Sequence, residues 1–363
     1  ESSPSVEASI DIRDGFTGWD GHHMSLEVAD YVFHGENPAD FAGAGLSGAG
    51  DVDGDGLADM LIPSYFYDGV GENSGKIYLV RATDIGEPGE YELGDMPYQF
   101  EGERADDEAG HSTASAGDID GDGLDDLLFC GYRSSDPLHE NGRVYLLFAG
   151  DLGEPRVRNL ESSDVIWVGE GAGDRVGHAF ISLGDADGDG LVDLATGAYG
   201  NDSAGEDAGK TYVIPGSSIG DFRGEREFGT HEYTFVGEVP GDESGHALRG
   251  AGDVDGDGLN DLVLGARLND LGATDGGKAY LISGGSLGTP GDNVSLADAD
   301  YTFYGEVAQG WVGYQVSGAG DVNGDGYSDM VSLDAGEQML EIFTFTESGN
   351  MLYATGFKIY ESK

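Results

Sequence analysis

Short apolar runs alternate with polar turns along almost the whole chain. The runs are rich in Val, Ile, Leu, Tyr and Phe, and the turns between them are rich in Gly, Asp and Asn. LVLG at 262–265 followed by KAYLI at 278–282 shows the pattern. No segment has a sustained 3.6-residue apolar period. The pattern therefore predicts many short β-strands and no long helix.

The same runs recur with a fixed period, which decides the architecture. A nine-residue acidic segment, DVDGDGLAD in its first copy, recurs with starts 67 or 68 residues apart. An aromatic-x-Gly-Glu signature precedes each copy, as in YTFVGE at 233–238, and Gly-basic-x-Tyr follows four of them, as in GKTY at 209–212. Each unit offers four strands, as β-propeller blades do. One four-stranded sheet cannot bury both of its faces alone, whereas neighbouring blades of a propeller cover each other's faces.

We therefore expect an all-β protein, a β-propeller of four-stranded antiparallel blades forming one domain. The five visible repeats span about 37–103, 104–170, 171–238, 239–306 and 307–363. Residues 1–36 are expected to be an N-terminal segment with ring-closing strands or part of a blade, because 24–36 resembles 293–306, where a blade ends. A total of six or seven blades remains an open alternative. The sequence also leaves open whether the chain is a fragment of a longer protein.

Charge narrows the function classes. The chain holds 70 Asp and Glu against 17 Lys and Arg, a formal net charge of −53. Binding to nucleic acid or to an anionic membrane surface requires basic patches, so both partners are excluded. No apolar run is long enough for a transmembrane helix. Cys130 is the single cysteine, so no intrachain disulfide braces the fold.

The acidic segments have the chemistry of calcium loops. Acidic residues stand at positions 1, 3, 5 and 9, and Gly at positions 4 and 6 permits a sharp turn. Ca²⁺ takes six to eight oxygen ligands at roughly 2.3–2.6 Å, which these carboxylates and the position-7 carbonyl supply. The loops lack His and Cys, which argues against Zn²⁺. We predict about five Ca²⁺ sites, held by Asp51, Asp53, Asp55, Leu57 and Asp59; by Asp118, Asp120, Asp122, Leu124 and Asp126; by Asp185, Asp187, Asp189, Leu191 and Asp193; by Asp253, Asp255, Asp257, Leu259 and Asp261; and by Asp321, Asn323, Asp325, Tyr327 and Asp329. Asn323 removes one charge, so the fifth site is predicted to be the weakest.

Together these motifs resemble the FG-GAP repeat of the integrin α-subunit propeller, which also occurs in bacterial surface proteins. The resemblance covers about residues 30–335 and includes Asp-x-x-Gly before the loop and Gly-Ala after it, as at 197–198. It implies Ca²⁺ in the loop between strands 1 and 2 of each blade. One departure is that Tyr199 and Arg267 replace the Pro of the family's Gly-Ala-Pro.

A ligand surface is expected on the face opposite the metal loops. Successive turns of a meander alternate between the two ends of the sheet, so the variable strand 2–3 connections lie on that opposite face. Function concentrates where a scaffold varies, and aromatic and Arg side chains dominate binding hot spots. The candidates there are Tyr65, Phe66, Tyr67, Tyr132, Arg133, Tyr199, Arg267 and Trp311.

Two other sets of aligned residues are interpreted as structural. His111, His178 and His246 share one repeat position, which favours packing between blades, with a channel-lining role as the alternative. The basic residues of Gly-basic-x-Tyr are expected to pair with local carboxylates. GSSIG at 216–220 and GGSLG at 284–288 match the nucleophile-elbow pattern, but they align with a recurrent turn after the third strand.

We favour a non-catalytic function, in which an extracellular or cell-surface module stabilised by calcium binds a protein or glycan. A role in adhesion is inferred only by analogy with integrins. The periplasm is the alternative location. A structural subunit of a surface assembly or filament, self-assembling or part of a larger chain, is the second hypothesis. A polysaccharide-active, lyase-like enzyme is the third, and it would need a base and a cationic group in one cleft.

Overall fold

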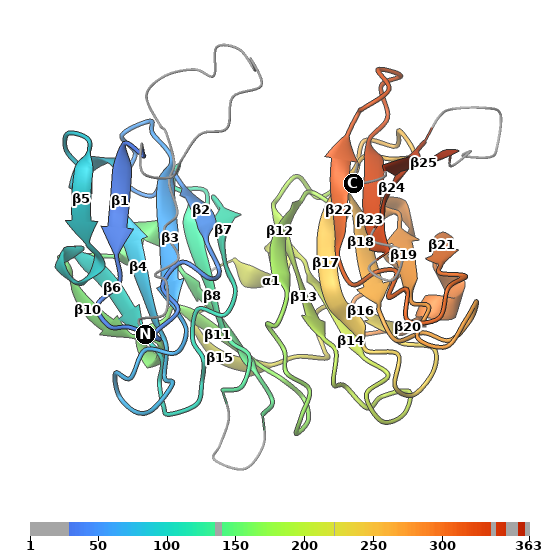
Figure 1. The fold of residues 1–363 in the computed structure, drawn as a ribbon, viewed down its shortest axis with the longest axis horizontal. Coiled ribbons are helices and arrows are strands. Elements are labelled where there is room, and N and C mark those ends of the chain that lie inside the picture. The colour runs from blue at the N-terminus through green and yellow to red at the C-terminus, as the bar shows by residue number, and fades with distance from the viewer. Residues whose placement is uncertain (1–28, 135–139, 221, 335–338, 346–354, 360–363) are drawn as a thin grey trace.

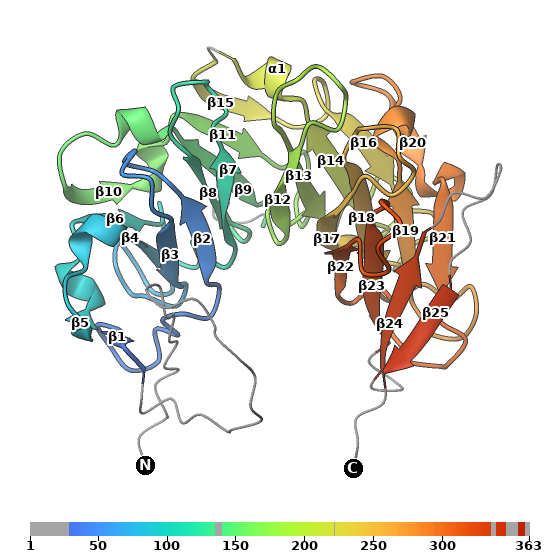
Figure 2. The same ribbon diagram turned by 90° about the horizontal axis from the view of Figure 1, so that it is seen from above.

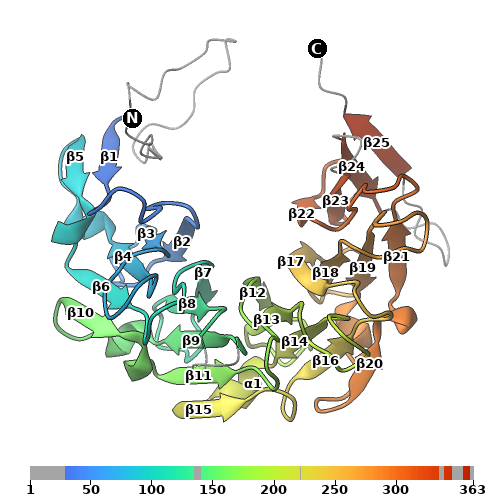
Figure 3. The same ribbon diagram turned by 60° about the horizontal axis from the view of Figure 1, so that its bottom comes forward.

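The described residues form five four-stranded antiparallel blades that follow one another along the chain. The computed structural model describes residues 29–134, 140–220, 222–334, 339–345 and 355–359. Figures 2 and 3 show the blades along an open arc, with the first and fifth blades at its two ends. The four strands of each blade are β2 (Ser47–Gly50), β3 (Asp59–Ser64), β4 (Lys76–Val80) and β6 (Tyr98–Glu101); β7 (Thr113–Gly117), β8 (Asp126–Gly131), β9 (Arg143–Leu147) and β11 (Val165–Val168); β12 (Phe180–Gly184), β13 (Asp193–Ala198), β14 (Lys210–Ile214) and β16 (Tyr233–Val236); β17 (Ser244–Gly252), β18 (Asp261–Ala266), β19 (Lys278–Ile282) and β21 (Tyr301–Tyr304); and β22 (Val316–Gly320), β23 (Asp329–Asp334), β24 (Met339–Thr344) and β25 (Thr355–Ile359). The architecture is the expected all-β propeller of antiparallel blades.

A further strand in several repeats was not predicted. In the sequence it follows the third strand of its repeat and precedes the fourth. In space it pairs in parallel with the outer strand of the preceding repeat. These strands are β5 (Gly89–Glu92), β10 (Arg156–Asn159), β15 (Gly224–Glu227) and β20 (Asn293–Ser295). They are polar and mostly exposed, so they carry no apolar run by which the sequence could reveal them.

The outer strand that β5 meets is β1 (Tyr31–His34), which carries the aromatic-x-Gly-Glu signature of a fourth strand. Figure 1 shows the two strands side by side at one end of the arc. Residues 1–28, most of the expected N-terminal segment, lie outside the described residues.

Short helical turns connect the strands. The recurrent turn after the third strand is helical in each of the first four blades, and a second turn precedes most outer strands. Ser218 and Ser286 lie in these turns, where Ser218 donates to the Pro215 carbonyl and Ser286 to Asp300. Within the described ranges, no helix has the length and apolar character that a membrane crossing needs. The turns are η2 (Ala82–Asp84), η3 (Leu93–Asp95), η4 (Ala149–Asp151), η5 (Leu160–Ser162), α1 (Gly216–Ile219), η6 (Gly284–Ser286) and η7 (Leu296–Asp298).

The hydrophobic core lies between blades rather than in one centre. Side chains alternate along β8: Leu127 and Phe129 pack into the cluster shared with the first blade, whereas Leu128 and Cys130 pack into the cluster shared with the third. Successive strand residues point to opposite faces, and both faces of an inner blade are covered. This explains why the second strand of each repeat is a continuous apolar run.

Close backbone approach between blades explains the Gly of the Gly-Ala motif. A Cβ at Gly197 of β13 would collide with the carbonyl oxygen of Gly245 in β17, and one at Gly265 would collide with that of Gly313. Only glycine permits this contact. The adjacent Ala198 is fully buried in the interblade core.

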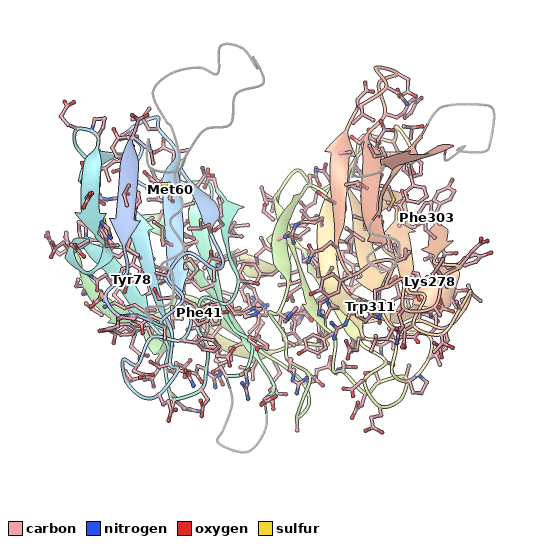
Figure 4. All side chains as sticks on the ribbon, in the orientation of Figure 1. Phe41, Met60, Tyr78, Lys278, Phe303 and Trp311 are labelled. Atoms are coloured by element: carbon pink, nitrogen blue, oxygen red, sulfur yellow. The ribbon has the colours of Figure 1, made fainter. Side chains whose placement is uncertain are left out.

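A repeated ion pair joins consecutive repeats and accounts for two sequence signatures. Lys76 Nζ lies 2.6 Å from Glu36 Oε1, and the Tyr78 hydroxyl donates to the same oxygen at 2.7 Å. Arg143 and Tyr145 meet Glu103 at 3.0 Å each in the next repeat. The basic residue and Tyr come from Gly-basic-x-Tyr, and Glu comes from the aromatic-x-Gly-Glu of the preceding repeat. The expected pairing with carboxylates is confirmed. Figure 4 labels Tyr78 and Lys278 in the first and fourth blades.

Candidate functional site

Each acidic loop connects the first and second strands of a blade, and its own backbone orients its carboxylates. In the first loop, Asp51 Oδ1 accepts from Gly54 N at 2.8 Å and Asp51 Oδ2 accepts from Gly56 N at 2.9 Å. Asp55 Oδ1 accepts from Leu57 N at 2.7 Å. The other four loops repeat these bonds. Gly54 and Gly56 have φ of 73° and 84°, conformations that disfavour other residues.

The ninth residue anchors each loop. Asp126 is fully buried; its Oδ2 accepts from Ile119 N and its Oδ1 from Ala149 N, each at 2.9 Å. Burial raises the pKa of Asp126 to about 7, and the charges of Asp120 and Asp122 add to the increase. Burial likewise raises the pKa of Asp261 to about 7. A buried carboxylate beside other carboxylates is costly unless a cation offsets the repulsion.

The carboxylates of four loops converge. In each, one oxygen from each of three residues lies within 4.8 Å of the others, a spacing that fits a single cation. The oxygen-only donor set suits a hard divalent cation. The fifth loop, with Asn323, does not appear among these convergent groups of the described chain. The groups are Asp51, Asp53 and Asp59; Asp118, Asp120 and Asp122; Asp185, Asp187 and Asp193; and Asp253, Asp255 and Asp261.

The carbonyl ligands expected at position 7 stay a prediction, and the side chains of these residues differ in their exposure. Leu57 and Leu191 have exposed side chains, 53% and 45%, whereas Leu124 packs partly against the interblade core. Their backbone N–H groups are held by the position-5 carboxylates, as Leu124 N is by Asp122 Oδ1 at 2.8 Å.

The structure divides the expected ligand-face residues into two groups. Tyr65, Tyr132 and Tyr199 occupy equivalent positions after the second strands of the first three blades, and each contacts a histidine ring. Arg267 holds that position in the fourth blade. Its guanidinium contacts the Tyr314 ring at 5.8 Å and pairs with Glu243 at 2.6 Å. Contacts with the histidine rings and Tyr314 link these residues in one continuous row.

The remaining candidates are engaged locally. Phe66 packs edge-on against Phe41 at 5.3 Å, and the Tyr67 ring faces Lys76 Nζ at 4.4 Å. Arg133 pairs with Glu108 at 2.7 Å and with Glu140 at 2.8 Å, so it is neutralised within the protein. Trp311 is 38% exposed and lies 6.4 Å from the Tyr314 ring. Figure 4 labels Phe41 and Trp311 at a similar level of the first and fifth blades.

The histidines that share one repeat position form a row across three blades. The rings of His111 and His178 lie 5.1 Å apart, and those of His178 and His246 lie 4.6 Å apart. The Tyr132 ring touches the first two histidines, and the Tyr199 ring touches the last two. The row thus packs between blades as interpreted, and it also lines a cavity of about 430 Å³.

The histidines are uncharged at neutral pH. Burial lowers the pKa of His178 to about 4 and that of His246 to about 3, and the positive charge of Arg267 lowers both further. Burial also lowers the pKa of His111, although Glu108 partly opposes this. The candidate residues chosen from the sequence did not include these histidines. The available signal was their shared position, seven residues before the second, third and fourth acidic loops.

Comparison with known proteins identifies the repeats. A family model described as FG-GAP repeat matches residues 109–147 and 245–282. The chain is 34% identical over 166 residues to integrin alpha-PS2 of Drosophila melanogaster, covering 44% of this chain and 12% of that protein. It is 33% identical over 232 residues to human integrin alpha-IIb, covering 57% and 21%. The bovine phosphatidylinositol-glycan-specific phospholipase D is 30% identical over 212 residues, covering 56% and 24%.

Among solved structures, a rhamnogalacturonan lyase overlaps 84% of this chain and 56% of its own, at 14% identity and a TM-score of 0.39. That similarity is too low to support an argument. The chain spans 12% to 24% of the length of the three sequence relatives. The repeat signatures, the blades and the sequence matches all indicate the same kind of repeat. The chain therefore contains FG-GAP repeats and folds as a β-propeller that is similar in sequence to integrin α-subunits.

Proposed function

We propose that this chain is a calcium-stabilised, non-catalytic binding module that takes a protein or glycan ligand outside the cell or at its surface. One observation carries the calcium assignment: three carboxylates converge within 4.8 Å in each of four successive blades. Backbone N–H groups hold those carboxylates in place, which reduces the cost of ordering the loop around a cation. The four convergent loops are the stronger sites, and the fifth loop is the weakest of five.

The calcium ions act as braces in this proposal. Each loop joins the two inner strands of a blade, and its ninth Asp ties the loop to the turn after the third strand, as Asp193 does through Gly216 N at 2.8 Å. A cation at this junction would replace the bracing that disulfides provide elsewhere. The opposite ends of the strands, with Tyr65, Tyr132 and Tyr199, remain available for a ligand.

The ion pairs of the basic residues between and within repeats support binding rather than catalysis at those positions. Lys210 pairs with Glu170, Arg143 with Glu103, and Arg175 with Glu140. A cation whose charge is satisfied by a structural carboxylate is poorly placed to neutralise a substrate. The integrin relatives favour an adhesion-type role and an extracellular setting, which remain part of the proposal because the chain covers a minor part of each.

Thermal melting with and without calcium tests the bracing role. We expect EDTA to lower the melting temperature by more than about 10 °C, and Ca²⁺ to restore it better than Mg²⁺, because an ion that binds only the folded state stabilises it by mass action. Metal analysis of the dialysed protein should find four to five Ca²⁺ per chain. An unchanged melting curve with EDTA would contradict the calcium assignment.

Ligand arrays test the binding role separately. Protein and glycan arrays are probed in Ca²⁺ and in EDTA, with mass photometry to detect ordered assembly and a turnover assay on acidic polysaccharides. Calcium-dependent capture of one ligand class supports the module. Ordered assembly without capture would favour the structural-subunit alternative, and turnover would favour the enzyme.

A further inference from the structure

The cavity beside the histidine row differs in charge from the rest of the molecule. Its lining includes no Asp or Glu, although the chain has 70 of them and a net charge of −53. The lining comes from the innermost strands and the segments before them, and it is made of small, hydroxyl-bearing, imidazole and apolar side chains, with Arg249 as its charged residue. A volume of about 430 Å³ is within the range of small-ligand pockets.

Arg249 is unlike the paired basic residues described above. Its side chain is exposed at the cavity, and its Nη1 donates a hydrogen bond to the Leu248 carbonyl oxygen at 2.8 Å. No ion pair with a carboxylate is formed by Arg249 within the described residues, whereas Lys76, Arg143 and Lys210 each form at least one. The remaining guanidinium N–H groups form a planar fork that matches a carboxylate.

The histidines add neutral hydrogen-bonding groups to the same cavity. His178 Nδ1 lies 3.2 Å from the His246 carbonyl oxygen, which fixes the proton on Nδ1 and leaves Nε2 as an acceptor. Nδ1 of His111 and of His246 is buried without a partner, and none of the three Nε2 atoms is hydrogen-bonded within the described chain. The Nε2 atoms are therefore the ring nitrogens left for a ligand.

We propose that this cavity binds a carboxylate-bearing sugar, a uronate residue of an acidic glycan, with the carboxylate on Arg249 and ring hydroxyls on the histidine Nε2 atoms. This inference rests on the proposed binding function and names its ligand class and site. The Arg249 guanidinium would bind the carboxylate of the sugar, and the neutral imidazoles would hydrogen-bond its hydroxyl groups. The concave cavity fits a sugar ring better than it fits the flat surface of a protein. The exposed amide of Gln315, which also lines the cavity, adds a further hydrogen-bonding group.

The test compares digalacturonate with its uncharged counterpart, galactobiose, by titration calorimetry on the full chain. Free Ca²⁺ is held constant, because uronates themselves bind Ca²⁺, and NaCl is kept at about 0.15 M to screen the net charge of the protein. We expect digalacturonate to bind at least about tenfold more tightly than galactobiose, since a charge-assisted pair contributes roughly that factor.

Arg249→Gln should weaken digalacturonate binding by about tenfold or more and leave galactobiose binding within about threefold. Arg223→Gln is the matched control. Arg223 is also exposed and pairs with no carboxylate in the described chain, but it contacts the Phe148 ring at 3.8 Å and does not line the cavity. His178→Phe keeps an aromatic ring, removes the acceptor and should weaken both sugars. Melting curves check that each variant folds.

The results separate this inference from the proposed function. Equal affinity for the two sugars, an unchanged affinity in Arg249→Gln, or preference for an acidic peptide over digalacturonate would overturn the uronate site and leave the calcium-stabilised module intact. A melting temperature that EDTA does not change would contradict the calcium-stabilised module. It would not affect the conclusion about uronate binding in the cavity.

Discussion

Lys210 Nζ lies 2.8 Å from Glu170 Oε1 and thereby joins two consecutive repeats. The Lys210 side chain is 3% exposed and that of Glu170 is 32% exposed, and the Tyr212 hydroxyl donates to the same carboxylate oxygen at 3.1 Å. The pair lies at the junction between the second and third blades. It shows that the carboxylate closing one repeat is the partner of the cation opening the third strand of the next.

Replacing Lys210 by Met should destabilise the protein. The change leaves Glu170 and Tyr212 without their cation, and we expect a loss of about 2–3 kcal/mol, below the full effect for a buried pair because Glu170 is partly solvated. Urea unfolding measures the loss. Arg156→Met, at an exposed position of β10, is the control. In a double-mutant cycle with Glu170→Gln, strictly additive losses would show that the pair has no coupling.

Asp126 and Asp122 should respond differently to calcium removal. Asp126→Asn replaces an acceptor of two backbone N–H groups by one that can accept only through a single oxygen, so we expect a loss of about 2 kcal/mol that persists in EDTA. Asp122→Asn keeps the acceptor for Leu124 N but removes a ligand charge, so its loss should disappear in EDTA. Melting curves in Ca²⁺ and in EDTA compare the variants.

The exposed Asp95→Asn serves as control for both loop variants, since Asp95 lies in η3 away from the convergent groups. A Ca²⁺-independent loss in Asp122→Asn, equal to that of Asp126→Asn, would argue that the loop carboxylates are structural acceptors and not ligands.

Gly197→Ala should separate the third and fourth blades. The new Cβ meets the Gly245 carbonyl, and overpacking of this kind costs about 1–3 kcal/mol or more. Gly48→Ala in β2 is the matched control, because a Cβ there has nothing within 4 Å. Differential scanning calorimetry of the two variants makes the comparison, and equal transitions would show that the blades tolerate a wider spacing.

Acid should weaken the fold through the histidine row. The folded pKa values of about 4 for His178 and about 3 for His246 lie below the ordinary 6.5, mainly because of burial, so the unfolded chain binds these protons more readily. The stability that neutral His contributes is complete above about pH 6.5 and declines as the pH falls from there toward 4. We expect His178→Gln to reduce that decline by about 1–2 kcal/mol at pH 5.

Urea unfolding at saturating Ca²⁺, from pH 7.5 to 5, gives the slope for the parent chain and the variant, and their difference isolates the histidine. His34→Gln is the control, since the His34 side chain is 38% exposed and lies beside Glu90. Parallel slopes in the parent and His178→Gln would show that His178 does not titrate differently in the folded state.

The sequence alone was sufficient for the repeating architecture. A 67- or 68-residue period, with strand-like runs and glycine-bearing turns, is local information, and each copy repeats it. The acidic loops were equally readable, because an Asx-type turn needs its carboxylates and glycines at fixed spacing. The charge distribution also led us to expect no nucleic-acid partner, without reference to a fold.

Tertiary structure decided what the local pattern could not. The polar strands β5, β10, β15 and β20 form because the outer strand of the preceding repeat offers unpaired backbone groups, and a neighbour in space leaves no hydrophobic signature in the strand that joins it. The histidine row is another case: His111, His178 and His246 are 67 or 68 residues apart in sequence, and only the packing of consecutive blades brings their rings to within 5.1 Å of each other along the row. The sequence determined the blade and its acidic loop because their information is local. The arc of blades determined the cavity because its walls come from several repeats.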